Sequence, residues 1–206
     1  NFCSIDKMYG KSFRRFSIER ILADIANAKQ QGANFIIFSD DNFTLDVKGF
    51  ESLCDAIAEA GHNDIRYIIQ ASSTGIASSD TLAKKMARAG FRIVFLGIEN
   101  VSEENLRLMK KGNIIEKTKL AVKRLHEQNI MIVGGMIIGN PNDKEEDIAR
   151  NYEFFVDSQI DFFADQILTP YPKTGMREEL LQSGLVTNKY DYSRYNCFWA
   201  NVKTNF

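Results

Sequence analysis

Two patterns of apolar residues alternate along the chain. Residues 17–31 repeat an apolar side chain every three or four positions, so that Ile18 and Ile25 fall on one helical face. Residues 130–141 are instead apolar almost throughout and carry no charge, which is typical of a strand buried on both faces. The alternation predicts helices that connect and cover buried strands.

The patterns also place the individual elements. The short apolar stretches predict five strands, within residues 34–44, 65–73, 91–100, 130–141 and 161–172. The helical periodicity predicts helices over residues 17–31, 47–60, 80–89, 103–111, 115–128, 144–158 and 175–183. Asp143, with Glu146 three residues later, resembles a capping box for the helix at 144–158. We expect residues 1–186 to form the main domain and residues 187–206, which lack periodicity, an extension packed on it.

Nearly continuous apolar strands that alternate with helices predict a parallel sheet with helices on its outer face. Right-handed crossovers give such a sheet either an open doubly wound form or a barrel. The chain has no G-x-G-x-x-G or Walker motif. Five strands are too few for a barrel of eight units, so the sequence favours an α/β fold with a partial barrel.

Composition narrows the class of function. The chain has 206 residues and a net charge of −1, so we expect no broad basic surface for nucleic acid. No apolar run reaches the roughly 20 residues that a membrane helix needs. The three cysteines, Cys3, Cys54 and Cys197, form no disulfide framework, which indicates the reducing cytoplasm. Cys54 lies on an apolar helical face and is predicted to be a core thiol.

Polar residues and glycine follow the strands at their carboxyl ends, where barrels and open sheets bind their ligands. Asp40 and Asp41 follow the first strand, Ser72 the second, Glu99 the third and Gly139 the fourth. The residue types alone would suit a divalent-metal-dependent barrel enzyme that uses Asp40, Asp41 and Glu99. They would also allow a non-catalytic barrel module that docks a partner through the aromatic tail at residues 190–199.

The beginning of the chain suggests a third class. It opens with "NFC" and has no initiator Met, so we expect a cut point inside a longer protein, after a first strand. In the radical S-adenosylmethionine (SAM) superfamily, the loop after the first barrel strand carries C-x-x-x-C-x-Φ-C, where Φ is usually aromatic. Residues 1–3 resemble the end of that motif, with Phe2 as Φ and Cys3 as the third cysteine.

Further segments resemble motifs of the same superfamily, in the same order. They are "FSDDNFT" (38–44), "FLGIEN" (95–100) with "SEENLRLMKKG" (102–112), "GGMIIGNPNDKEED" (134–147) and "LTPYPKTGM" (168–176). Together they identify the chain as a member of the radical SAM superfamily, resembling its cobalamin-associated members such as the anaerobic magnesium-protoporphyrin IX monomethyl ester oxidative cyclases. The resemblance implies a partial (β/α)6-type TIM-like barrel whose first strand is missing here.

The resemblance implies a cofactor set. Radical SAM proteins hold a 4Fe–4S cluster on three thiolates and cleave SAM reductively to a 5′-deoxyadenosyl radical. Cys3 would be a metal ligand, and Phe2 would adjoin the cofactor. Since the other two cysteines of the motif are absent, we expect this chain alone to bind no stable cluster and to be inactive.

The same resemblance implies the contacts to SAM. Asp40 or Asp41 would accept from the amino group, Glu99 from the ribose hydroxyls, and Lys111 would offset the carboxylate charge. The adenine would lie against a strand whose implied contacts are Gly135, Ile137 and Gly139. Ser72 stands where relatives often have an arginine, which makes it a further cofactor-binding candidate.

The resemblance leaves the net reaction open between tetrapyrrole cyclase-like oxidation and cobalamin-dependent methyl transfer, with cobalamin held by an upstream domain. It implies a small-molecule substrate and an electron donor such as flavodoxin or ferredoxin. We expect neither a nucleic-acid partner nor a membrane span.

Overall fold

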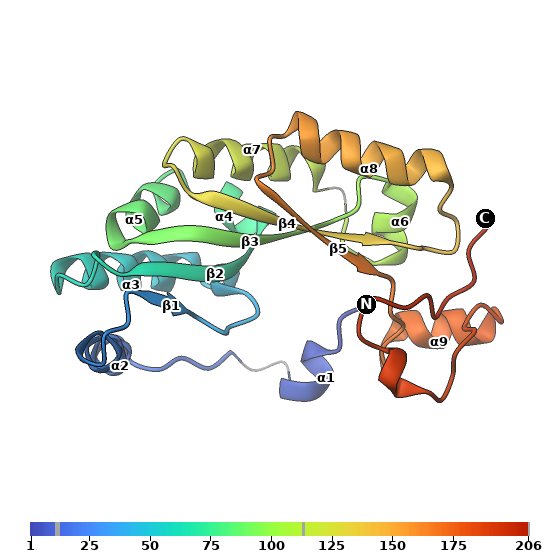
Figure 1. The fold of residues 1–206 in the computed structure, drawn as a ribbon, viewed down its shortest axis with the longest axis horizontal. Helices are drawn as coiled ribbons and strands as arrows, with labels where there is room; N and C mark the ends of the chain where they lie inside the picture. The colour runs from blue at the N-terminus through green and yellow to red at the C-terminus, as the bar shows by residue number, and fades with distance from the viewer. Residues whose placement is uncertain (11–12, 113, 206) are drawn as a thin grey trace.

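The fold is a curled parallel sheet with helices on its outer side (Figure 1). The computed structural model of the chain describes residues 1–10, 13–112 and 114–205. Five strands pair in sequence order, all parallel: β1 (Phe35–Ile37), β2 (Arg66–Ser72), β3 (Phe91–Glu99), β4 (Met131–Ile138) and β5 (Phe162–Ile167). The sheet forms a half-barrel, so the α/β partial-barrel prediction is confirmed.

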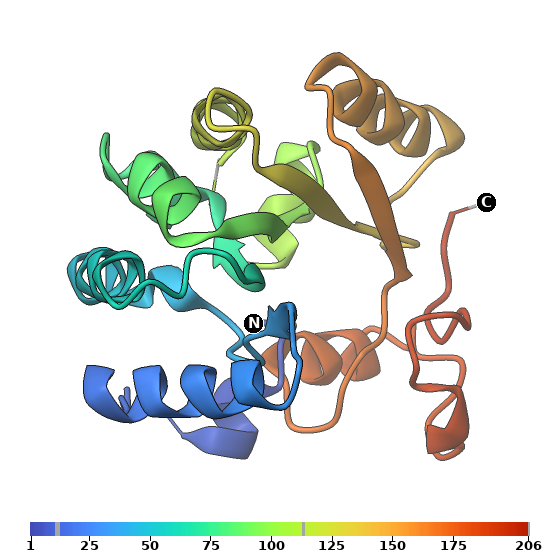
Figure 2. The same ribbon diagram turned by 60° about the vertical axis from the view of Figure 1, so that its left-hand side comes forward.

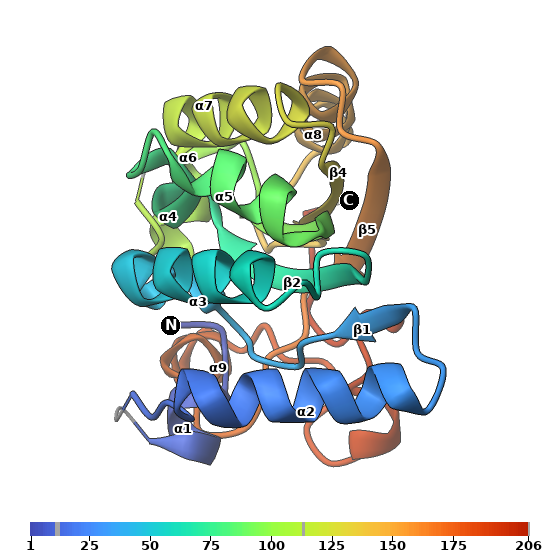
Figure 3. The same ribbon diagram turned by 90° about the vertical axis from the view of Figure 1, so that its left-hand side faces the viewer.

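Helices cover the convex side of the sheet. They are α2 (Ile18–Gln30), α3 (Val47–Glu59), α4 (Ser73–Ala77), α5 (Leu82–Ala89), α6 (Glu103–Leu108), α7 (Ile115–His126) and α8 (Glu145–Asp157). Figure 2 shows α3, α5, α7 and α8 as an outer arc around the strands. In Figure 3 the strands follow a curve, with α2 at one end and α8 at the other. The open side carries α1 (Ile5–Tyr9) and α9 (Gly175–Gln182) (Figure 1).

Two apolar cores hold these layers together. The main core lies between the sheet and the outer helices, and includes Tyr67, Phe91 and Cys54, which are all fully buried. As predicted, Cys54 is a core thiol, and burial raises its pKa because the thiolate would lose hydration. The second core lies near the carboxyl ends of the strands and consists of Met109, Ile137, Leu168, Met176, Leu180, Val186 and Val202.

The first strand is shorter than the apolar pattern predicts. After β1 the chain turns, because the Asn42 side chain accepts a hydrogen bond from the Thr44 amide at 3.0 Å and starts the short helix η1 (Phe43–Leu45). Helix α4 was not predicted. It begins where Ser72 accepts from the Gly75 amide at 3.1 Å, and this local cap has no periodic signature.

The predicted capping box of Asp143 and Glu146 is wrong. Helix α8 begins after Lys144, whose amide donates to the Asp147 carboxylate at 3.0 Å. Asp143 is instead fully buried and accepts a hydrogen bond from the Asn140 amide at 2.8 Å. Buried amide donors bind this carboxylate, so it does not cap the helix. The N-cap is the next residue, Lys144.

The segment after α9 packs on the barrel end. It contains the short helix η2 (Tyr192–Arg194) and an antiparallel bridge between Val186 and Val202. The boundary between residues 1–186 and 187–206 remains a prediction. Within the part of the chain that the structure describes, no helix combines the length and apolarity needed to cross a bilayer.

Candidate functional site

One row of residues marks the concave face near the carboxyl ends of the strands. Strand register pairs Ser72 with Gly97, Gly97 with Gly135, and Gly135 with Ala164. Leu96, next to Gly97, is buried in the main core, so Gly97 points to the opposite, concave face. Small residues thus line this row of the concave face.

An ion pair lies beside that row. The Lys111 ammonium donates to the Glu99 carboxylate at 2.5 Å and to the Gly97 carbonyl at 3.0 Å. Both side chains are largely buried, with 15% of Glu99 and 24% of Lys111 exposed. A Cβ at Gly97 would stand 2.7 Å from the Glu99 carboxylate, so the glycine makes room for the pair. The two residues predicted to contact different parts of SAM contact each other.

Glu99 has an unusual backbone. Its φ is +67°, in the left-handed region, and the Asn100 amide donates back to the Ile98 carbonyl at 2.9 Å. This is a γ-turn with a non-glycine residue at its centre, which costs free energy. The turn ends β3 and directs the chain towards α6.

The predicted adenine strand is more closely packed than expected. The space above Gly135 is taken by the Phe95 ring, which would stand 2.6 Å from a Cβ there. Ile137 is 6% exposed and belongs to the second core. Gly139 has a φ of +79° and needs glycine for that conformation. Contact of these residues with adenine stays a prediction, and the structure gives each of them a packing or backbone role.

The structure gives other hydrogen-bond partners or surroundings to the predicted residues that follow β1 and end β2. Asp40 and Asp41 are both exposed, and Asp40 lines a cavity of about 720 Å³ beside α2 and β1. Ser72 caps α4 and lies 2.9 Å from the Thr44 hydroxyl, which ties η1 to the end of β2. Among the described residues no group of three or more His, Cys, Asp or Glu could hold a metal ion. A divalent-metal site formed by Asp40, Asp41 and Glu99 therefore does not assemble.

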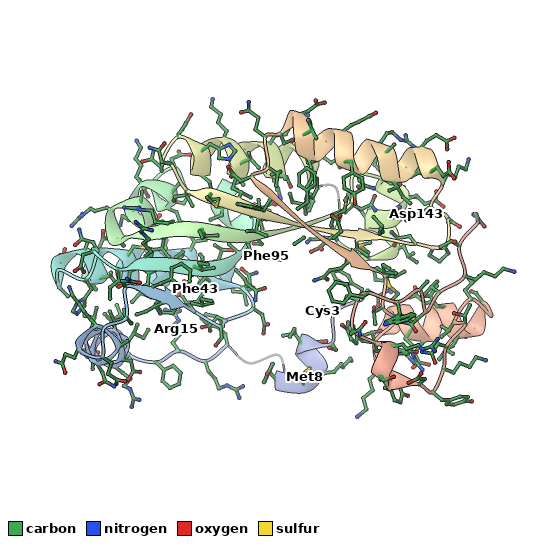
Figure 4. All side chains as sticks on the ribbon, in the orientation of Figure 1. Cys3, Met8, Arg15, Phe43, Phe95 and Asp143 are labelled. Carbon is green, nitrogen blue, oxygen red and sulfur yellow. The ribbon has the colours of Figure 1, made fainter. Side chains whose placement is uncertain are left out.

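The amino-terminal segment crosses the open side of the half-barrel. The Met176 amide donates to the Asn1 carbonyl at 3.3 Å, and Phe2 packs on the second core. Cys3 is exposed in this segment, and Figure 4 shows it on the open side of the sheet. Its role as a cluster ligand stays a prediction.

A tyrosine and a second cysteine lie close to Cys3. The Tyr171 hydroxyl is 3.1 Å from the Cys197 sulfur. Burial raises the pKa of Tyr171 to about 12, with smaller contributions from Cys197 and from the charge of Cys3. Cys54 lies in the main core. The described residues thus offer one exposed cysteine of the predicted motif, Cys3, and they do not make a cluster site by themselves.

The prediction from sequence missed several residues that shape this site. Gly97, Asn100 and Tyr171 lie inside segments quoted for the resemblance, but none was singled out. A glycine two residues before a strand-end acid was the available signal for Gly97. Asn100 carried no such signal, because its role depends on a partner 37 residues away.

Comparison with known proteins gives the same assignment. The family profile described as "Radical SAM superfamily" matches residues 1–155. The chain is 28% identical over 202 residues to bacteriochlorophyllide d C-12(1)-methyltransferase of Chlorobaculum tepidum, covering 96% of the chain and 43% of the relative. It is 26% identical to anaerobic magnesium-protoporphyrin IX monomethyl ester cyclase of Cereibacter sphaeroides, covering 95% of the chain and 32% of the relative.

A solved structure shares the fold. The radical S-adenosylmethionine methyltransferase TsrM from Kitasatospora setae, with cobalamin and a [4Fe-4S] cluster bound, superposes with a TM-score of 0.74 at 19% identity. The match covers 82% of this chain and 32% of TsrM. The chain spans less than half the length of each of these relatives.

Proposed function

The chain belongs to the radical SAM superfamily, and on that premise we propose that its concave face binds SAM for reductive cleavage to a 5′-deoxyadenosyl radical. The family uses a 4Fe–4S cluster, which supplies the electron for that cleavage. Cys3 would be one ligand of the cluster. The remaining thiolates are not among the described residues.

The ion pair of Glu99 and Lys111 above Gly97 carries the proposal. A carboxylate and an ammonium stand side by side at the carboxyl ends of the strands. SAM offers hydroxyl donors to the first and a carboxylate acceptor to the second. Asp40 or Asp41, both exposed, would accept from the amino group.

The relatives suggest the wider reaction. They include a bacteriochlorophyllide methyltransferase and a magnesium-protoporphyrin ester cyclase, and the TsrM structure contains cobalamin. We therefore propose a small-molecule substrate, with either cobalamin-dependent methyl transfer or cyclase-like oxidation as the net reaction. An electron donor such as flavodoxin or ferredoxin would supply the reducing equivalent. Three free cysteines in the described chain support a reducing, cytoplasmic setting.

The test is formation of 5′-deoxyadenosine. The protein, expressed with its native flanking sequence, is reconstituted anaerobically with iron and sulfide and then given dithionite and SAM. We expect 5′-deoxyadenosine from the wild type and none from Cys3→Ser. Cys54→Ala is the matched control, because it removes a thiol from the main core and should retain product formation. Product formation that survives Cys3→Ser would contradict the assignment of Cys3.

A further inference from the structure

A network of buried side-chain amides joins the ends of β3 and β4. Asp143 lies at its centre, fully buried, on the loop after β4 (Figure 4). Its carboxylate accepts from the Asn105 side chain at 2.6 Å, from the Asn140 amide at 2.8 Å and from the Asn140 side chain at 3.3 Å. No lysine, arginine or histidine forms an ion pair with it among the described residues. A buried carboxylate is costly unless several donors satisfy it, so this one fixes its donors in place.

The network reaches the end of β3 through Asn100. This side chain is 1% exposed and donates to the Ile137 carbonyl of β4 at 3.1 Å. Its oxygen accepts from the Ser102 amide at 2.8 Å and from the Asn105 side chain at 3.4 Å. Asn105 therefore connects Asn100 to Asp143. The Asn100 side chain thus contacts β4 on one side and the start of α6 on the other, where the chain passes from β3 to α6.

Asn100 directly follows the strained residue. Glu99 keeps a φ of +67° without being glycine, and the Asn100 amide closes the turn around it. Such a conformation persists only where the surroundings fix it. Release of Asn100 would let Glu99 return to an extended backbone. A change of φ from +67° to an extended value would turn the Cα–Cβ bond of Glu99 relative to β3, so its carboxylate would no longer be held against Lys111.

We propose that Asn100 is a positioning residue, oriented by Asp143 through Asn105, which holds the Glu99 carboxylate against Lys111 on the concave face. The inference rests on the proposed function for the identity of the ligand, SAM. The geometry that it describes, the Glu99–Lys111 contact, does not depend on a ligand.

Asn100→Ala is the direct test, and Asn151→Ala is its matched control. Asn151 is also fully buried and also accepts from a backbone amide of the same loop, that of Val101, at 2.8 Å. Loss of either side chain should destabilise the fold to a similar extent. Only the loss of Asn100 frees the turn at Glu99, so the pair of variants separates positioning from stability.

Two readouts are measured on the folded proteins. The first is SAM affinity without reductant, by equilibrium dialysis, which should fall about tenfold in Asn100→Ala, the loss expected for one charge-assisted hydrogen bond. The second needs no ligand: a double-mutant cycle of Glu99→Gln and Lys111→Met in urea unfolding. We expect a favourable coupling between the two residues in the wild type and in Asn151→Ala, and none in Asn100→Ala.

The outcomes are separable. If Asn100→Ala keeps both the coupling and the affinity, or if Asn151→Ala loses both equally, the positioning role is wrong. If the wild type binds no SAM, the proposed function fails while the coupling still decides the inference. Should Asn100→Ala not fold, Asp143→Asn replaces it. This variant keeps the size of the side chain but turns one acceptor into a donor, and it should weaken the coupling.

Discussion

At the scale of single residues, the site depends on the absence of a side chain at Gly97. The Glu99 carboxylate and the Lys111 ammonium occupy the space that a Cβ would need, at 2.7 Å and 3.4 Å from its position. Both groups are the far ends of flexible side chains, so they can move away at small cost to stability. We therefore expect the proposed ligand contact of the pair to be more sensitive to a side chain at this position than the fold is.

Gly97→Ala should therefore weaken SAM binding more than it weakens the fold. The added methyl group displaces both partners, and we expect about a tenfold loss of SAM affinity, since one charge-assisted contact is lost. The free energy of unfolding should fall by about 1 kcal/mol or less, because flexible side chains absorb the clash. Equilibrium dialysis and urea unfolding measure the two effects. Unchanged affinity in a folded Gly97→Ala protein would mean that the pair does not contact the ligand.

The sequence singled out Glu99 and Lys111 as candidates but did not predict their contact with each other. Both were implied by the resemblance of the segments that contain them, residues 95–100 and 102–112. Their mutual contact spans 12 residues and requires the turn at Glu99. Asp143 was taken for a helix cap because carboxylates favour helix starts. Its burial depends on amide donors from α6 and from the start of its own loop, Asn105 and Asn140, and periodicity contains no information about such donors.

At the scale of elements, α3 and the start of α5 are joined through one carboxylate. Glu51 accepts hydrogen bonds from the Ser79 hydroxyl and, at 2.8 Å, from the Thr81 hydroxyl. The Lys85 ammonium lies 3.7 Å from the Glu51 carboxylate. The Ser79 hydrogen bond lowers the pKa of Glu51 below its ordinary value of 4.5. The ionised form is thus favoured in the folded state.

The lowered pKa sets the pH dependence of this contact. Since the folded pKa is depressed, the stabilisation is fully present above the unfolded pKa of 4.5 and is lost as the pH falls through the folded pKa. We expect Glu51→Gln to be less stable than the wild type by about 1 kcal/mol at neutral pH, with the difference shrinking in acid. Urea unfolding of both proteins from about pH 7 to about pH 3 measures it.

Glu116→Gln is the control for this titration. Glu116 lies on α7 with 84% of its side chain exposed, and its carboxylate pairs with the Lys119 ammonium of the same helix at 2.9 Å. Its replacement should change stability little at any pH. A Glu51→Gln difference that stays constant from neutral to acid pH would contradict the role of the charge.

The elements themselves were largely predictable. All five strands lie inside the predicted apolar stretches, and most helices begin and end within a few residues of the predicted bounds. Burial against the sheet makes the strands apolar throughout and gives each helix one apolar face, and both patterns are visible in the sequence. The misses include α1, α4 and the shortened β1. The last two arise where a serine or an asparagine side chain caps a turn, at Ser72 and at Asn42. Such caps are local hydrogen bonds, which strand or helix periodicity does not report.

At the scale of the whole molecule, a buried arginine fastens the carboxy-terminal segment to the barrel end. Arg177 on α9 is 7% exposed, and its guanidinium donates to the Pro170 carbonyl at 2.9 Å, the Tyr195 hydroxyl at 2.5 Å and the Lys189 carbonyl at 3.0 Å. The same guanidinium lies 5.3 Å from the centre of the Tyr195 ring. One side chain thus joins the end of β5, α9 and the final segment.

Arg177→Met should release that segment while the barrel stays folded. Methionine keeps much of the apolar stem but loses every donor, so the carbonyls of Pro170 and Lys189 lose their partner. We expect faster tryptic cleavage after Lys189, which is exposed, and a red shift in the fluorescence of Trp199, the only tryptophan of the chain. Arg150→Met on α8, where the arginine side chain is 65% exposed, is the matched control and should leave both unchanged.

Release of the carboxy-terminal segment would also affect the open side of the half-barrel. Val186 and Val202 bridge the base of the segment and complete the second core, on which Phe2 packs. Release of the segment would therefore loosen the neighbourhood of Cys3 as well as that of Cys197. We expect Arg177→Met to raise the rate at which a thiol reagent labels Cys197, relative to the Arg150→Met control. Equal labelling and equal cleavage in the two variants would show that the apolar contacts hold the segment without the arginine.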